Sequence, residues 1–128
     1  MADVELVEDD IKAADALVDL LEEKDFPLKA ALWLFQAAAE RWRFVLCPVE
    51  KRKDPTTFYK DFARVVNATG HPREFLDLNR VDIVTEESPL IKVLGRAIRV
   101  EGRSHMRVQD SSFNGVFLED ALIYKLSA

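Results

Sequence analysis

Four basic residues have a spacing that could create a binding site for anions. Lys92, Arg96, Arg99 and Arg103 follow one another at steps of four, three and four residues, with Arg107 just beyond. On one continuing helix, residues three and four apart are neighbours, so these side chains would share a face. Because phosphates bind such cations, we treat this basic face as a candidate nucleic-acid site. The simpler interpretation is a solvated helix face whose cations complement the helix dipole.

Acidic side chains near the predicted strands are a second source of chemistry. They are Asp77, Asp82, Glu86, Glu87, Glu119 and Asp120. Metal-dependent nucleases gather acids at strand ends beside a basic residue, and Lys92 could supply that residue here. The spacing is not specific for a metal, and carboxylates on surfaces and turns are common. We therefore predict no metal site and no cofactor.

Asp120 interrupts an apolar pattern near the end of the chain. The alternating register is Val116, Leu118, Asp120, Leu122, Tyr124, which places this carboxylate on an otherwise apolar strand face. A buried carboxylate needs a partner, so we expect it to pair with an arginine or with backbone amides. The alternative is a catalytic acid with a raised pKa.

A thiol or imidazole site would combine Cys47 with His71 or His105. A nucleophilic cysteine needs a base within hydrogen-bonding reach, and neither histidine belongs to a recognisable motif. A buried thiol and two loop histidines are the favoured interpretation. The four glycines are scattered, and none forms a phosphate-binding loop at the start of a helix. The sequence leaves enzymatic activity open, with a non-enzyme favoured.

Composition indicates a folded domain spanning residues 1–128. The chain is 48% hydrophobic and 32% charged, has one cysteine, and begins without a signal-peptide pattern. Its apolar runs fall far short of the roughly 20 residues that span a bilayer. These features predict a cytoplasmic protein with no membrane association. The net charge of −5 is uneven, because residues 1–25 hold ten acids against two lysines.

The segment 31–49 contains four aromatic residues whose spacing favours a hairpin over a helix. They are Trp33, Phe35, Trp42 and Phe44. A reversal near Ala38 would set two aromatic pairs opposite each other, while Pro48 would end or kink a helix. The tip lacks the glycine or asparagine of a tight two-residue turn, so we expect a longer loop or one helical turn. This aromatic face is predicted to be core or a subunit interface.

The remaining patterns complete an α+β fold in the order αββαβαββ. We expect an acidic helix at about 8–24, a helix from Asp54 to Gly70, a strand within 76–84 and a helix after Ser88. Asn114 and Gly115 predict a final hairpin. Together these give one domain with three helices and a mainly antiparallel sheet of about five strands.

The leading functional hypothesis is a small cytoplasmic binding or assembly protein without chemistry of its own, acting as a homodimer. It follows from the missing catalytic signatures and from the aromatic and charged faces, which offer recognition surface. The alternative is a nucleic-acid-binding protein, or a degenerate metal-dependent nuclease, that uses the basic face. A further option is that the acidic first helix pairs with that basic face, within the chain or across a dimer.

Overall fold

Five strands and two helices build the described part of this α+β protein. The computed structural model describes residues 8–23, 28–36, 38–49, 60, 63–64, 80–85, 87–98, 100, 103–113 and 115–126. The elements follow in the order α1 (Glu8–Glu23), β1 (Leu28–Gln36), β2 (Arg41–Pro48), β3 (Val81–Ile83), α3 (Pro89–Ala97), β4 (Met106–Phe113) and β5 (Val116–Leu126).

The strands form one mixed sheet in the order β3-β2-β1-β5-β4. The pairs β1–β2, β1–β5 and β4–β5 are antiparallel, whereas β2 and β3 are parallel. Parallel neighbours need a long crossover connection, and residues 49–80 supply it between β2 and β3. The sheet is therefore mixed, and only the β3 edge departs from the antiparallel arrangement that the sequence predicts.

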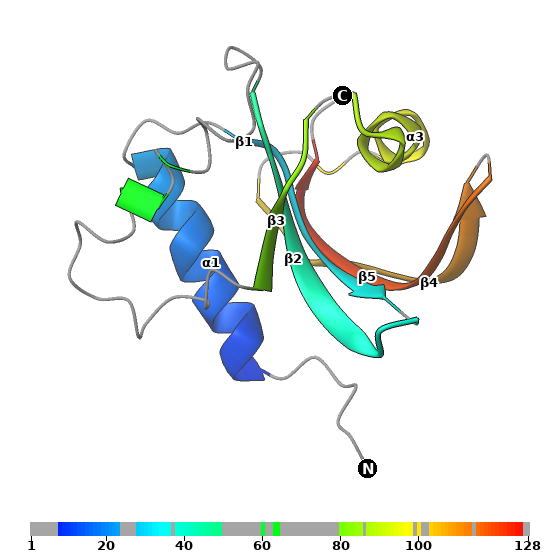
Figure 1. The fold of residues 1–128 in the computed structure, drawn as a ribbon, viewed down its shortest axis with the longest axis horizontal. Coiled ribbons are helices and arrows are strands. Elements are labelled where there is room, and N and C mark those ends of the chain that lie inside the picture. Colours follow the sequence, from blue (N-terminus) through cyan, green and yellow to red (C-terminus); the bar gives the residue numbers. More distant parts are fainter. Residues whose placement is uncertain are drawn as a thin grey trace.

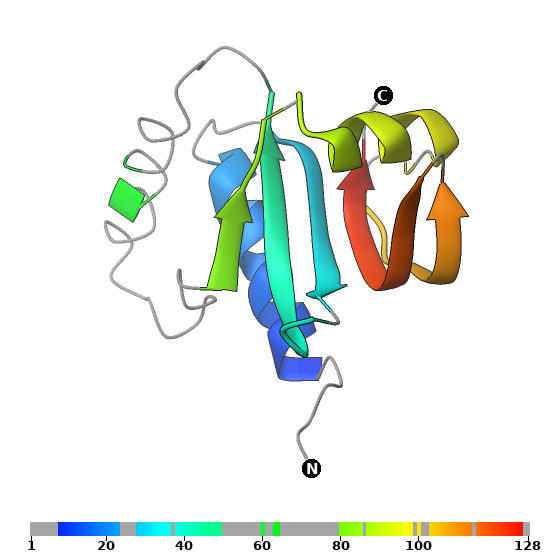
Figure 2. The ribbon, with the colours of Figure 1, turned by 45° about the vertical axis from the view of Figure 1, so that its right-hand side comes forward.

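Each face of the sheet is covered by one helix (Figure 1). Leu17 and Leu21 of α1 belong to one buried cluster together with Trp33, Phe44 and Tyr124. Ile91 and Leu94 of α3 belong to the other, and their sheet partners are Leu32, Val45 and Ile123. Figure 2 shows α1 behind β2 and β1 and α3 in front of β5. Because side chains alternate along a strand, β1 and β2 contribute to both clusters.

The acidic helix α1 confirms the helix predicted at about 8–24. Ala14, Leu17, Val18 and Leu21 recur at helical spacing and are fully buried. Three acids occupy the first turn, where the positive end of the helix dipole favours them. The helix therefore packs through an apolar stripe and leaves its carboxylates on the flanks.

The first hairpin confirms the pairing predicted from the aromatic spacing. In the register of β1 and β2, Trp33 lies opposite Phe44 and Phe35 opposite Trp42. The ring centroids are 5.1 and 5.4 Å apart, within the range of tilted aromatic pairs. The connection is a longer loop, in which Glu40 has a φ of 51°. A residue with a side chain takes this left-handed conformation at a cost of about 1 kcal/mol.

Helix α3 starts where the sequence predicts. It ends before it could carry Arg103 on one helix face with Lys92 and Arg96. Ser88 is its N-cap and Pro89 its first residue, and it ends at Ala97 with Ile98 extended. Val100 then pairs with Leu126 of β5. The β-branched side chains of Ile98 and Val100 favour this extended path. The helix expected from Asp54 to Gly70 lies outside the described residues, apart from residues 60, 63 and 64.

The β4–β5 hairpin bends at Asp110, and the bend changes which side chains face α3. Gly115 at the tip has a φ of 92°, and Asp110 within β4 has a φ of 47°. Leu118 and Ala121 both belong to the cluster under α3, whereas Leu122 belongs to the cluster under α1. Strict alternation is therefore lost here, and the expected register of Leu118, Asp120 and Leu122 on one face is wrong. The bend curls the hairpin toward α3 (Figure 1).

Replacing Phe44 by alanine should reduce the free energy of unfolding by about 3–5 kcal/mol, because its ring is fully buried in the α1-side cluster. Urea denaturation measures the change. The matched control is Phe117→Ala, which removes the same group from a residue that is 61% exposed and should change stability by under about 0.5 kcal/mol. Equal losses in the two variants would contradict the assignment of the core.

Candidate functional site

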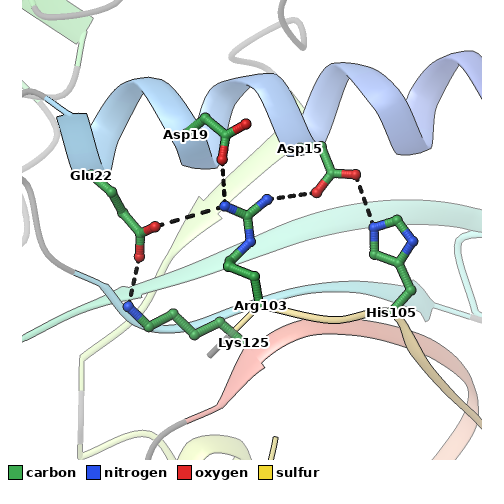
Figure 3. Close-up of polar contacts among 6 residues, drawn as sticks. All are labelled: Asp15, Asp19, Glu22, Arg103, His105 and Lys125. Carbon is green, nitrogen blue, oxygen red and sulfur yellow. Dashed lines mark hydrogen bonds and ion pairs between the residues drawn. The ribbon is translucent and has the colours of Figure 1, made fainter. Parts of the chain in front are cut away.

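A network of six polar side chains joins α1 to the sheet (Figure 3). Asp15, Asp19 and Glu22 project from one side of α1, because steps of four and three residues place them on one helix face. Arg103 and His105 come from the segment before β4, and Lys125 comes from β5. The network is the largest group of ion pairs among the described residues.

Arg103 is the centre of this network. Its Nη2 lies 2.6 Å from Asp15 Oδ1, and its Nη1 lies 2.5 Å from Asp19 Oδ1 and 3.7 Å from Glu22 Oε1. The Arg103 side chain is only 28% exposed. Burial alone would lower the pKa of Arg103, but its hydrogen bonds to Asp19 and Asp15 outweigh burial and raise it. The guanidinium is thus held in its charged form by helix carboxylates.

Two further side chains complete the network at either end. His105 Nε2 lies 2.8 Å from Asp15 Oδ2, and Lys125 Nζ lies 2.6 Å from Glu22 Oε2. The His105 ring also packs on Tyr124, with ring centroids 4.8 Å apart. These contacts fix the orientation of α1 on the sheet.

Near its N-terminal end, α1 is held by Tyr124 and Arg80. The hydroxyl of Tyr124 donates a hydrogen bond of 2.8 Å to the carbonyl oxygen of Ile11. Arg80 donates to both carboxylate oxygens of Asp10, at 3.0 and 3.3 Å, and its guanidinium lies 4.9 Å from the Trp33 ring centre. Burial raises the pKa of Tyr124, which keeps the phenol neutral and able to donate.

The basic face predicted from the sequence is divided between two sides of the sheet. Because α3 ends at Ala97, Arg103 leaves the line of Lys92 and Arg96 and lies beside α1 instead. Lys92 pairs with Glu87 at 3.0 Å, Arg96 is exposed on α3, and Arg99 lies outside the described residues. The expectation of one continuous helix face through Arg103 is therefore wrong. Anion binding by Lys92 and Arg96 stays a prediction.

Asp82 and Asp120, two of the carboxylates considered for metal binding, do not converge. Asp82 lies on β3 and Asp120 on β5, with β2 and β1 between them, a separation of about 14 Å at normal strand spacing. Asp82 accepts two hydrogen bonds from Arg43. Asp77 and Glu86 lie outside the described residues. Among the residues that the structure describes, no group of three His, Cys, Asp or Glu side chains could hold a metal ion.

Asp120 has the arginine partner that the sequence predicts. Its carboxylate accepts hydrogen bonds of 2.6 and 2.7 Å from Arg107 and one of 3.3 Å from Gln109. Burial would raise the pKa of Asp120, but these hydrogen bonds outweigh burial and lower it. A catalytic acid would need the opposite shift, so the geometry favours structural pairing with Arg107.

The thiol and the described imidazole lie on opposite faces of the sheet. Cys47 is buried in the cluster under α3, and its Sγ lies 3.7 Å from the Pro48 carbonyl oxygen. His105 contacts Asp15 and Tyr124 on the α1 side. The sheet therefore separates Cys47 from His105, and His71 lies outside the described residues. The geometry supports the interpretation of Cys47 as a buried thiol.

The aromatic face is mostly inside the chain's own core. Trp33 and Phe44 are 0% exposed and Trp42 is 6% exposed, whereas Phe35 is half-buried. The Arg107 guanidinium lies 5.7 Å from the Trp42 ring centre. A second subunit could therefore reach Phe35 without unfolding the chain but not the other three rings. The use of the four aromatic residues as a subunit interface stays a prediction. Trp33, Trp42 and Phe44 belong to the core, and Phe35 packs against it.

The sequence predicted that the acidic helix could pair with the basic face, and Arg103 confirms this for one member of that face. The other partners of α1 were missed. The carboxylate spacing of Asp15, Asp19 and Glu22 was visible as a helix face, but nothing local marked Lys125 or Arg80 as partners. The contacts of Lys125 and Arg80 join residues 103 and 70 positions apart. Such pairing depends on how the sheet is assembled, which no short sequence pattern encodes.

Comparison of the chain with family models, with curated proteins and with solved structures found no match. Among the described helices, neither has the length and apolar character needed to cross a membrane. The functional argument therefore rests on the α+β fold, on the ion pairs that use its charged groups, and on the surface that these leave open.

Replacing Arg103 by methionine should reduce the free energy of unfolding by about 1–3 kcal/mol, because Asp15 and Asp19 lose their shared donor while partly buried. Denaturation in urea measures the loss, and hydrogen exchange should locate it in α1. Arg96→Met is the matched control, since Arg96 is exposed on α3, and it should change stability by under about 0.5 kcal/mol. Unchanged exchange in α1 would contradict the role of Arg103.

Replacing Tyr124 by phenylalanine should cost about 0.5–1.5 kcal/mol at neutral pH through loss of the bond to Ile11. The difference from the parent should shrink with rising pH. Because the pKa of Tyr124 is raised in the folded state, its stabilising effect is present below the unfolded pKa of about 10 and lost above it. Urea denaturation from pH 7 to 11 tests this, and a constant difference contradicts it.

Proposed function

We propose that this protein is a cytoplasmic binding or assembly protein that has no chemistry of its own and acts as a homodimer. One observation carries the proposal. Both faces of the sheet are covered by helices, while β4 is an edge strand of eight residues whose side chains are largely exposed. A strand edge presents backbone N–H and C=O groups that can pair with another chain.

The charged side chains support a non-catalytic role. Arg103 and Lys125 bind the carboxylates of α1, and Arg107 binds Asp120. Groups that neutralise one another in fixed ion pairs hold the fold together, and they are poorly placed to transfer protons to a substrate. The thiol of Cys47 is buried, as expected of a small apolar residue in a reducing compartment.

The two edges of the sheet differ in length. On one side, β3 has three residues. On the other, β4 has eight, and among the described strands only β5 pairs with it. β4 contains neither lysine nor proline, the residues with which many proteins prevent an edge from pairing. A partner strand therefore has more backbone to engage at β4.

Two exposed apolar side chains belong to the same hairpin, one toward each end of it. The exposed large hydrophobic residues in the described part of the chain are Val49, Met106 and Phe117, which are 42%, 39% and 61% exposed. Two of these, Met106 and Phe117, belong to β4 and β5. Because exposed apolar area beside an open edge favours association, the hairpin is the best candidate for the binding surface.

The alternative functions receive less support from the geometry. A nucleic-acid footprint would use the basic face, but Arg103 is held by carboxylates of α1, which leaves Lys92 and Arg96 on α3. A degenerate nuclease would need carboxylates that meet, and Asp82 and Asp120 lie on separate parts of the sheet. Dimerisation through an edge requires neither arrangement.

Light scattering during size exclusion should give a mass of about twice 14.6 kDa at tens of micromolar protein. The dimer should persist at 1 M salt, because backbone pairing and apolar contact are screened far less than exposed ion pairs. A mass of 14.6 kDa across the concentration range contradicts the proposal. A dimer that dissociates in high salt would indicate association through charged faces instead.

A further inference from the structure

We infer that the second copy of this chain pairs antiparallel with β4, so that two β4 strands meet at Val108 and the two sheets become one. The inference rests on the proposed function and adds the surface and the register. Two identical edges related by a twofold axis run antiparallel when the axis is perpendicular to the sheet. Each copy then satisfies the backbone groups of the other.

The bend at Asp110 limits where the axis can lie. Side chains alternate between the two faces of β4 within residues 106–109 and again within 111–113. Asp110, with a φ of 47°, interrupts this alternation, so that even-numbered residues face α3 before the bend and odd-numbered residues after it. Val108 lies opposite Ala121, and Ser111 lies opposite Leu118, and both of these β5 residues belong to the cluster under α3. Directly opposed residues of an antiparallel pair share a face. The axis must therefore fall within one of these two segments, and Met106–Gln109 is the longer of them.

Within that range, the position of the axis decides which side chains of the two copies lie opposite each other. Their charges, and the faces on which they lie, favour an axis at Val108. An axis at Met106 would set Arg107 opposite the partner's His105, whose ring already contacts Asp15 and Tyr124 of its own chain. An axis at Arg107 would set two guanidinium groups directly opposite each other, which is unfavourable. An axis at Gln109 would set Arg107 opposite the partner's Ser111, whose side chain lies on the other face. With the axis at Val108, the two valines meet and Arg107 lies opposite the partner's Gln109. No like charges then face each other along residues 106–110.

The polar groups beside Val108 are already arranged for this register. In each copy, Arg107 and Gln109 both donate to Asp120, which places the guanidinium and the amide side by side on one face. In the dimer, the amide oxygen of the partner's Gln109 would accept from Arg107, and the symmetric contact would form as well. Met106, which is 39% exposed, lies on the other face beside Val108 and would lose water next to the two valines.

A cysteine at position 108 tests the register directly. Opposed residues of an antiparallel pair have Cα atoms about 4.5–5.5 Å apart, a separation that a disulfide can span. Val108→Cys should therefore form a covalent dimer under mild oxidation, as seen on a non-reducing gel. Ser112→Cys on the same strand is the control, because its two copies would lie about 27 Å apart. The native Cys47 is buried and should not react.

A charge pair at position 109 tests the same contact without a covalent bond. Gln109→Lys would face the partner's Arg107 and should raise the dimer dissociation constant by about fivefold, whereas Gln109→Glu should lower it or leave it unchanged. Analytical ultracentrifugation measures both. Within one chain the effects have the opposite sign, since Gln109 contacts Asp120 and lysine there is attractive. Urea denaturation at low protein concentration therefore separates association from folding.

The outcomes separate this inference from the proposed function. A dimer in which Val108→Cys and Ser112→Cys cross-link equally, and in which both Gln109 variants retain the parent dissociation constant, overturns the β4 interface while leaving assembly in place. A monomer in light scattering overturns both. If Val108→Cys does not fold, the two Gln109 variants decide, because Gln109 is exposed and its replacement spares the core.

Discussion

The packing of Trp33 on Phe44 is the contact around which the structure is organised. The two rings lie on neighbouring strands near the middle of the sheet, and α1 covers them. Phe44 also packs edge-on against Tyr124 of β5, at 5.5 Å between ring centres. Three strands thus share one aromatic cluster, which fixes the register of β1 with β2. Once that register is set, alternation sends the intervening residues to the opposite face, where α3 covers them.

Charge then orients the helix that this cluster holds. Apolar contact is not directional, so the burial of Leu17 and Leu21 alone would tolerate rotation or sliding of α1. The ion pairs are directional, because Arg103 reaches Asp15 and Asp19 one turn apart while Lys125 and Arg80 bind near the two ends. The same contacts occupy cations that could otherwise have bound a phosphate. The acidic first helix and the basic segment are therefore one structural unit.

The bend at Asp110 explains the shape of the second hairpin. By resetting the alternation, it directs Leu118 as well as Ala121 toward α3, so β4 and β5 curl around that helix. Curling exposes the convex side, where Arg107, Gln109 and Asp120 interact with one another. The strand order places β4 at the border of the described sheet.

The sequence by itself determined the local elements. The Trp33 and Trp42 spacing predicted the first hairpin, Asn114 and Gly115 the second, and the helical period α1, because each signal repeats over a few residues. Only the tertiary structure decided that β3 pairs in parallel, that α3 stops before Arg103, and that Arg103 meets Asp15, 88 positions away. These outcomes depend on contacts between distant segments. The stability of these long-range contacts depends on the assembled core, so no local pattern of residues predicts them.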